Sequence, residues 1–295
     1  MKTISNEHEK VIIQNKDHFK KGNNSCYYLD DHKRKFYKLW KELPESYDFL
    51  FSEYYNTLVA HGHVPGIIAG GELSSQIQVK GDYYKYALVY EKVDFSQFNG
   101  KIIKYVVSQW YKIWIQNLHL FFRILHIGGY VFFDFDWRNF GINKKNNKLI
   151  IFDIDSSVKL ESPMEKRKGG NQDFHRMFHI LANRYGEKTL RFFNFAALAE
   201  IYIATVFAIA ENDYKVLEKN RYNTLINYDP GNSKVRLPKE IKIHIKKKNI
   251  IEEYLNKIIA ICSEPFKLGA LNKFSDLRLN EIYKLTEKVI NDLFF

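Results

Sequence analysis

The sequence predicts an α+β protein with its elements segregated: a small β-rich N-terminal lobe, then a larger helical C-terminal lobe. Over the first third, short apolar segments are interrupted by turn residues, whereas from Lys101 onward long segments repeat their apolar residues at helical spacing. Strands first and helices afterwards are typical of the α+β class. The polar break at Asp94–Gly100 is the natural boundary. We therefore expect one domain, with lobes at 1–94 and 95–295 and a helical C-terminal extension.

In the N-terminal part, apolar alternation and turn residues predict strands and one helix. The strands are expected at Lys10–Phe19, Ser25–Leu29, Lys35–Trp40, Gly66–Leu73 and Tyr84–Val93. The first three should form an antiparallel meander. Leu43-Pro44-Glu45 has the character of a helix start, and this helix should lie between the third and fourth strands.

The C-terminal part is predicted to be helical. Helices are expected at Ile102–Leu125, Asp173–Tyr185, Thr189–Ala210, Asn249–Cys262 and Leu279–Leu293. The stretch Phe192–Ala210 is apolar enough to raise the question of a membrane span. An acidic residue at mid-segment, Glu200, would cost about 2.5–3.5 kcal/mol in a bilayer, so we expect a buried core helix.

Composition sets limits on compartment and partners. With 295 residues, 45% of them apolar, the chain can bury a real core. The two cysteines, Cys26 and Cys262, lie far apart, which argues against a disulfide scaffold or a zinc site and favours a reducing, cytoplasmic compartment. The N-terminus is polar and lacks a classical secretory signal. The formal charge of +11 favours anionic partners.

The most informative stretch is a polar loop followed by a short apolar hairpin. Asp134 and Asn139 stand in the loop, and the second hairpin strand, Leu149–Phe152, leads into Asp153. Phosphoryl transfer needs a carboxylate that orients the attacking hydroxyl and oxygen ligands that hold a metal against the phosphates. The residues for this chemistry stand here in the required order.

At this point the chain resembles the protein-kinase superfamily. Asp134 and Asn139 are five positions apart, as in the kinase catalytic loop, and Asp153 follows Asn139 by 14 positions, where that family places the metal-binding Asp. The resemblance implies a two-lobed kinase-like fold that uses ATP and Mg²⁺, with Mn²⁺ as a substitute. It also implies Asp134 as catalytic base and Asn139 and Asp153 as metal ligands.

The resemblance extends to a lysine and a glutamate in the N-terminal lobe. The segment Phe36–Trp40, which ends the third predicted strand, resembles the family's strand that carries its phosphate-binding lysine, and Lys38 would grip the α- and β-phosphates. Lys35 and Lys41 are competitors that lie off the face shared by Phe36, Lys38 and Trp40. Glu53, 15 positions beyond Lys38, would form the lysine–glutamate ion pair of the family, with Glu42 and Glu45 as alternatives.

Three further features follow the kinase order. Gly22 lies where the glycine-rich phosphate loop stands, although this loop has one glycine. The strand that contains Glu91 and Val93 resembles the hinge whose backbone binds adenine. Asp173 resembles the buried Asp that braces the catalytic loop.

The chain also departs from the family pattern. Phe132-Phe133 replace the His-Arg of the catalytic loop, and Asp136 stands where many protein kinases carry a lysine. Ile154 and Asp155 replace the Phe-Gly that follows the metal-binding Asp, and 20 positions separate Asp153 from Asp173. This trimming resembles compact effector kinases secreted by some bacteria, or atypical bacterial kinases of sugars and lipopolysaccharide.

The favoured function is transfer of the γ-phosphoryl group of ATP to a hydroxyl acceptor, in first place Ser or Thr of a protein. The alternatives are a kinase of a sugar, lipid or lipopolysaccharide, a catalytically weak pseudokinase that serves as an interaction module, and an adenylyl transferase. If the protein is an effector, it would enter a host cell by a non-classical route.

Other groups of residues support weaker functional predictions. The basic run Lys234–Lys248 could dock on an acidic membrane or polyphosphate, although a solvated basic face is the more common role for such a run. His119 and His126 are expected to be boundary histidines and not metal ligands. No nucleic-acid module pattern is present, so nucleic acid is not an expected partner.

Overall fold

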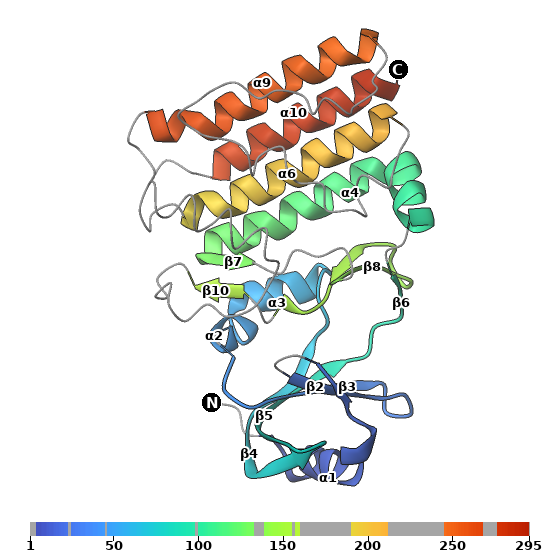
Figure 1. The fold of residues 1–295 in the computed structure, drawn as a ribbon, viewed down its shortest axis with the longest axis vertical. Coiled ribbons are helices and arrows are strands. Elements are labelled where there is room, and N and C mark those ends of the chain that lie inside the picture. The colour runs from blue at the N-terminus through green and yellow to red at the C-terminus, as the bar shows by residue number, and fades with distance from the viewer. Residues whose placement is uncertain are drawn as a thin grey trace.

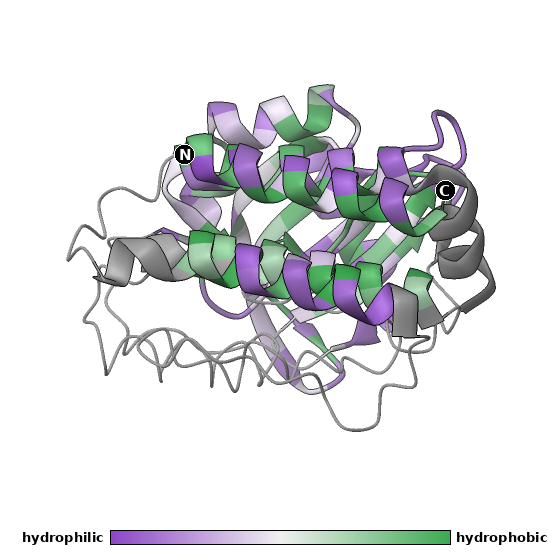
Figure 2. Cartoon of the chain, turned by 90° about the horizontal axis from the view of Figure 1, so that it is seen from above, coloured by the Kyte–Doolittle hydropathy of each residue, from purple (hydrophilic) through white to green (hydrophobic). Residues whose placement is uncertain are grey.

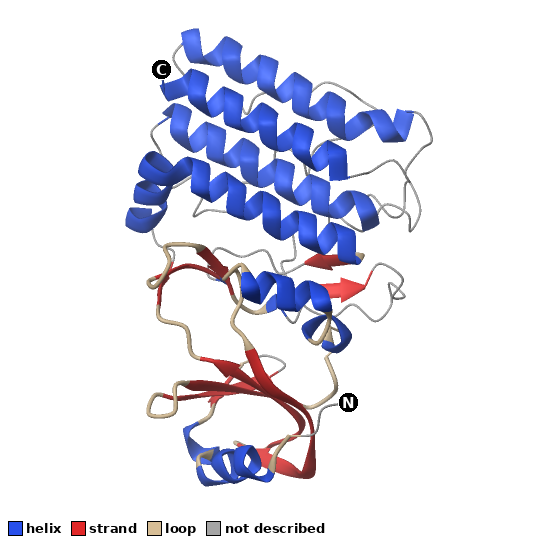
Figure 3. Ribbon diagram, turned by 180° about the vertical axis from the view of Figure 1, so that it is seen from behind, coloured by secondary structure: helices blue, strands red, loops and turns tan. Residues whose placement is uncertain are grey.

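The computed structural model describes residues 4–22, 25–44, 46–97, 100–132, 139–154, 157–159, 190–211, 245–267 and 276–294. It confirms the predicted α+β class, with a β-sheet in the N-terminal region and a helical C-terminal part. Figure 1 shows the sheet at one end of the molecule and the long helices stacked at the other. The view from behind gives the same separation of strands from helices (Figure 3).

The N-terminal region is built on a five-stranded antiparallel sheet of order β1-β2-β3-β5-β4. Its strands are β1 (Lys20–Lys21), β2 (Ser25–Asp30), β3 (Lys35–Trp40), β4 (Ile67–Val79) and β5 (Asp82–Glu91). The predictions for β2, β3 and β5 are confirmed to within two residues at each end. Strand β4 runs six residues beyond its predicted end, because a register irregularity between Glu72 and Ile77 breaks the alternation from which the end was predicted.

The predicted first strand, Lys10–Phe19, is wrong. This segment forms helix α1 (Asn6–Gln14) and the 3₁₀ turn η1 (Lys16–His18), and pairing starts only at β1. The buried residues of α1 are His8, Glu9, Val11 and Ile12, which share one face of a helix and do not alternate. The prediction overlooked this spacing. Helix α1 covers the outer face of the sheet (Figure 1).

The sheet separates two apolar clusters. Cys26, Tyr37, Leu39 and Val89 point to the face covered by α1. The alternate residues Trp40, Leu88 and Tyr90 point the other way and join the main core with the helical part. Because successive strand residues face opposite sides, this alternation gives the inner face of the sheet a defined set of side chains.

Short elements join the sheet to the helices. The predicted helix after Leu43 is two helices, α2 (Tyr47–Leu50) and α3 (Glu53–Ala60). Ser52 divides them: its hydroxyl donates to the carbonyl of Phe49 at 2.7 Å and accepts from the N–H of Tyr55 at 3.3 Å. The side chain thereby caps α3 where α2 ends.

Five short strands form two small sheets. Strands β6 (Phe95–Gln97), β8 (Phe140–Asn143) and β9 (Leu149–Ile151) form one, in the order β6-β8-β9, and β10 (Ser157–Lys159) pairs with β7 (Tyr130–Phe132). Both sheets lie between the large sheet and the long helices (Figure 1). Strand β6 falls in the segment predicted as the lobe boundary.

Four long helices form the rest of the core: α4 (Gly100–Gly128), α6 (Leu190–Glu211), α9 (Ile245–Lys267) and α10 (Asp276–Phe294). All four were predicted; α4, α9 and α10 are longer than expected, and α6 is shifted by one residue. In α4 the buried Trp114, Leu118, Phe121 and Leu125 recur at helical spacing. Hydrophilic and hydrophobic residues alternate along the helices viewed from above, as expected of helices with one buried face (Figure 2).

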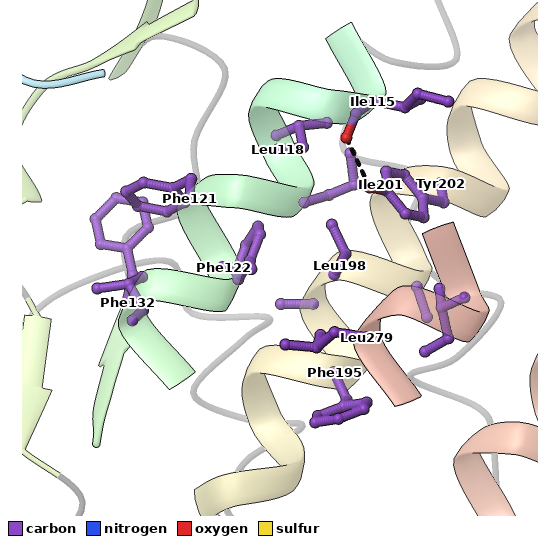
Figure 4. Close-up of a cluster of buried hydrophobic side chains, with 14 of the residues drawn as sticks. Ile115, Leu118, Phe121, Phe122, Phe132, Phe195, Leu198, Ile201, Tyr202 and Leu279 are labelled. Carbon is purple, nitrogen blue, oxygen red and sulfur yellow. Dashed lines mark hydrogen bonds between the residues drawn. The ribbon is translucent and has the colours of Figure 1, made fainter. Parts of the chain in front are cut away.

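The interfaces between the helices combine apolar packing with buried hydrogen bonds. Side chains from α4, α6 and α10 interdigitate in the close-up of the core (Figure 4). The hydroxyl of Tyr202 donates to the carbonyl of Ile115 at 2.8 Å, and the indole N–H of Trp114 donates to the hydroxyl of Thr205 at 3.2 Å. These bonds satisfy polar groups that would be costly to bury alone.

The apolar stretch at Phe192–Ala210 is a core helix, as predicted. Within α6 the described side chains from Asn194 to Ile209 are all buried against the rest of the chain. None of the helices in the described residues is long and apolar enough to cross a membrane. The predicted helix at Asp173–Tyr185 and most of the basic run Lys234–Lys248 lie outside the described residues; the end of the run forms the first turn of α9.

Candidate phosphate and metal site

Lys38 lies on the inner face of the sheet, on β3. Strand pairing places Tyr27 of β2 and Leu88 of β5 directly opposite it. The residue is 8% exposed, and its amine lies 5.3 Å from the centre of the Trp40 ring. The strand therefore holds the lysine stem among apolar side chains and directs its charge toward Asp153. The position of Lys38 on β3 follows the prediction, which placed it on one face with Phe36 and Trp40.

The charged amine of Lys38 lies against the side chain of Asp153. The amine of Lys38 and the carboxylate of Asp153 form an ion pair between residues 115 positions apart. The Asp153 side chain is 47% exposed, so solvent reaches the carboxylate from one side. The structure thus brings together two of the residues predicted for the site.

The backbone of Asp153 is unusual. Its φ angle is 57°, in the left-handed region that non-glycine residues seldom adopt. Such conformations cost free energy and concentrate at functional sites, where the surrounding structure maintains them. The turn after β9 therefore supports a specialised role for this acid.

Asn139 stands next to Asp153 in the hairpin. It immediately precedes β8, and its carbonyl accepts a hydrogen bond from the N–H of Phe152 at 2.7 Å. Strands β8 and β9 pair from Phe140↔Ile151 to Ile142↔Leu149. The hairpin consequently fixes Asn139 and Asp153 at the same end of the two strands, as the sequence order predicted.

The segment after α3 braces this hairpin. The N–H of Ile151 donates to the carbonyl of His63 at 2.8 Å, and the His63 ring donates through Nδ1 to the carbonyl of Leu149 at 3.0 Å. The Lys148 amine donates to the carbonyl of His61 at 3.0 Å. These contacts connect the strand that leads to Asp153 with the segment that follows β3 and α3.

His63 is buried, and it was absent from the predicted site. Burial lowers the pKa of its ring to about 4, despite the opposing effect of the Leu149 carbonyl. The ring is therefore neutral at physiological pH. A lone histidine in a turn has no distinguishing spacing, so sequence reasoning had no signal for this brace.

Aromatic rings lie beside Lys38 on the same face of the sheet. The Tyr27 ring stacks on Phe36 with centroids 5.8 Å apart, and the Phe36 ring lies 6.1 Å from that of Tyr90. Tyr27 remains 37% exposed. The sequence prediction named Phe36 only because it shares a strand face with Lys38. The period-two alternation of β2, β3 and β5 could also have placed Tyr27 and Tyr90 on this face.

The other predicted nucleotide-site residues are more dispersed. Glu53 is the first residue of α3 and its side chain is exposed, while the described ion pair of Lys38 is with Asp153. Gly22 follows β1, where its N–H donates to the carbonyl of Ser25 at 2.8 Å. The lysine–glutamate pair stays a prediction.

In the predicted hinge, Glu91 ends β5 and Val93 lies just beyond it. The N–H of Glu91 already donates to the carbonyl of Gly66 at 2.8 Å, and that of Lys92 donates to the carbonyl of Arg34 at 2.9 Å. A base contact at Glu91 would therefore use its carbonyl oxygen. The predicted catalytic base, Asp134, and its neighbour Asp136 lie outside the described residues.

Comparisons with known proteins give distant structural likenesses but no match in sequence. No protein-family profile matches the chain, and no curated protein matches it. Among solved structures, the chain is similar to a ROP18 kinase domain in complex with AMP-PNP and sucrose. The identity is 11%, the TM-score is 0.42, and the match covers 92% of this chain and 80% of the other.

The groups at the site suit a metal–phosphate ligand. A lysine amine binds phosphate as a point charge, and carboxylate and amide oxygens are the ligands that Mg²⁺ prefers. Among the described residues, no cluster of three or more His, Cys, Asp or Glu side chains could hold a metal alone. One carboxylate and one amide fit Mg²⁺ shared with substrate phosphates, because that ion keeps much of its coordination for water and phosphate oxygens.

Proposed function

We propose that the chain is a Mg²⁺-dependent ATP phosphotransferase that passes the γ-phosphoryl group to a hydroxyl acceptor. The ion pair between Lys38 and Asp153 carries this proposal, because it joins a strand of the N-terminal sheet to the hairpin of the helical part. Phosphoryl transfer depends on such positioned charges more than on covalent chemistry.

Each residue has a distinct role in the proposal. The Lys38 amine binds the α- and β-phosphates, and Asp153 and Asn139 supply the oxygen ligands for Mg²⁺. The metal, when bound, neutralises charge on the phosphates. Asp134 accepts the hydrogen bond of the acceptor hydroxyl and orients it for attack.

The ion pair also bears on the stability of the protein. Lys38 is almost buried, and a buried cation without a partner costs much free energy. The Asp153 carboxylate pairs with the Lys38 amine. In a complex with Mg-ATP, phosphate oxygens would be available to Lys38 and the Asp153 carboxylate would be available to the metal.

We propose a Ser or Thr hydroxyl of a protein as the acceptor, with a sugar or lipid hydroxyl as the alternative. The support is the five-position separation of Asp134 and Asn139, which matches the protein-kinase catalytic loop. Many protein kinases carry a lysine where this chain has Asp136. A substitution at Asp136 would therefore test which acceptor the chain uses.

A labelling experiment tests the reaction class. The purified chain is incubated with Mg²⁺ and ATP labelled at the γ- or the α-phosphate, alone and with a mixed protein substrate. We expect transfer of γ-label only, and its loss in Asp134→Asn. Transfer of α-label would mean adenylyl transfer and would contradict the proposal.

The turn between β1 and β2 favours a second candidate, a nucleotide-binding interaction module with little turnover. Strand β1 has two residues, and Gly22 already bonds back to Ser25. A turn closed in this way has little length with which to cover phosphates. In the labelling experiment this candidate predicts no transfer of either label, together with retained binding of Mg-ATP.

A further inference from the structure

A shallow, open cavity of about 670 Å³ lies at the predicted hinge. It shares Val93 with that hinge, while Lys38, Asn139 and Asp153 are not among its lining residues. It is lined by Lys92, Val93, Asp94, Phe95, Lys144 and Lys145. Two segments far apart in sequence build it: the chain that leaves β5 and enters β6, and the turn between β8 and β9. In Figure 1 β6 and β8 lie side by side at the junction between the large sheet and the helices.

The walls of the cavity are fixed by local hydrogen bonds. Strand β6 pairs with β8 from Phe95↔Asn143 to Gln97↔Gly141, and the N–H of Lys144 donates to the carbonyl of Asp94 at 2.9 Å. In the turn, the N–H of Lys145 donates to the Asn143 side chain at 2.9 Å. A ligand would thus meet a preformed surface and would pay little free energy to order it.

The rim of the cavity has a surplus of positive charge. The acids nearby are already paired: Arg34 lies 2.7 Å from Asp94, and Lys92 lies 2.6 Å from Asp31. The Arg34 guanidinium, helped by Lys92 and Lys144, holds the pKa of Asp94 below its ordinary value. Lys144 and Lys145 are exposed on the turn, and neither forms an ion pair with another of the residues that the structure describes.

Two of the residues that line the cavity, Val93 and Phe95, are apolar. Val93 is half-buried, and Phe95 is 37% exposed while its ring lies 4.2 Å from that of Phe152. Apolar and basic side chains in one cavity fit a ligand that has an apolar side chain flanked by carboxylates. A bare phosphate would satisfy the lysines and leave Val93 and Phe95 exposed to water.

We propose that this cavity, which we call the hinge-side cavity, is a docking site for an acidic peptide segment of a partner protein. The segment carries an aliphatic residue that contacts Val93 and Phe95, and Asp or Glu residues on either side of it that contact Lys144 and Lys145. The volume lies within the range of about 300–1,000 Å³ that ligand sites occupy, which is enough for several side chains. The proposal does not depend on catalysis at Lys38 and Asp153.

Fluorescence anisotropy with a defined probe tests the docking site. The probe is fluorescein-labelled Glu-Glu-Glu-Leu-Glu-Glu-Glu, and the variant is Lys144→Glu/Lys145→Glu. The matched control is Lys284→Glu/Lys288→Glu, which makes the same change in net charge at exposed positions of α10. At 0.15 M salt the Debye length is about 8 Å, so charges on α10 have little influence at the cavity.

We expect the parent and the α10 control to bind the probe alike, and the turn variant to bind it roughly tenfold more weakly or worse. A probe with glycine in place of leucine should also bind more weakly. Equal weakening by both charge reversals would attribute binding to the general positive field and would overturn the proposal. So would equal binding of a Lys-Lys-Lys-Leu-Lys-Lys-Lys probe, or displacement of the acidic probe by millimolar inorganic phosphate, which would identify a small-anion site. Circular dichroism of both variants controls for folding.

Discussion

The aliphatic stem of Lys38 packs among apolar side chains and its amine is charged. A substitution can remove the charge and keep the stem. Methionine keeps the length and apolar character of the stem and removes the amine. In Lys38→Met the phosphates lose their cationic partner, so we expect affinity for Mg-ATP to fall roughly tenfold or more. Stability should change by less than about 1 kcal/mol, because the abandoned Asp153 carboxylate is 47% exposed and can be hydrated.

Fluorescent-nucleotide binding and urea denaturation measure these two effects separately. Lys41→Met is the control, because Lys41 is also a lysine of this sheet region but pairs with Asp82 at the surface, at 2.9 Å. Equal loss of nucleotide affinity in both variants would remove the special role of Lys38.

His63 makes stability depend on pH. Its folded-state pKa of about 4 lies below the ordinary value of 6.5, so the unfolded chain takes up a proton in a range where the folded chain does not. The contribution of His63 to the free energy of unfolding is therefore complete above pH 6.5. It is lost as the pH falls from 6.5 to 4, and the total loss is roughly 3 kcal/mol. In His63→Gln the fall over this window should be smaller.

Urea denaturation of parent, His63→Gln and His61→Gln at several pH values between 7 and 4 tests this dependence. The exposed His61 lies two residues away, and its variant should keep the pH dependence of the parent. If His63→Gln retains that dependence too, the acid sensitivity comes from other groups.

Residues of the candidate site differ in how far the sequence predicts them. Lys38 lies within the strand β3 and Asp153 follows the apolar strand β9, so alternation and motif order define the positions of both residues. His63 contributes through its own buried ring and its backbone carbonyl, and no residue type is required to supply a carbonyl. Such a brace can be recognised only when the turn after α3 and the strand β9 are seen together.

At the scale of elements, the long helices were predicted best and the first segment worst. Helices α4 and α10 carry many apolar residues at regular spacing, which gives a strong periodic signal. Helix α1 has nine residues, with two apolar residues among its four buried ones. The buried His8 and Glu9 complete its inner face, and polar residues on a buried face conceal a helical pattern.

The contact between α4 and α6 offers a test of the helical core. Tyr202→Phe removes the hydroxyl that donates to the Ile115 carbonyl and preserves the ring (Figure 4). A buried hydrogen bond of this kind contributes about 1 kcal/mol, so the free energy of unfolding should fall by that amount. Tyr83→Phe, at a position that is 57% exposed, should have almost no effect. Equal urea midpoints for parent and Tyr202→Phe would show that the bond contributes nothing.

For the whole molecule, the two-part arrangement follows from the order of the patterns along the chain, but the contacts between the parts do not. The sheet and the helices each have a local pattern of apolar residues. The contacts that connect them join residues 115 and 86 positions apart, Lys38 with Asp153 and His63 with Leu149. Those contacts depend on register and on turn geometry, which a single sequence does not specify.

Titration calorimetry with ATP in the presence of Mg²⁺ tests the central claim most directly, by comparing the parent with Asp153→Asn and Asp292→Asn. Asp292 is an exposed acid on α10, so its variant has the same change in charge far along the sequence from the site. If Asp153 supplies a metal ligand, the parent and Asp292→Asn bind Mg-ATP with the same affinity, while Asp153→Asn binds it roughly tenfold more weakly or worse. The claim is contradicted if Asp153→Asn binds Mg-ATP as tightly as the parent does, or if the parent binds no ATP with either Mg²⁺ or Mn²⁺.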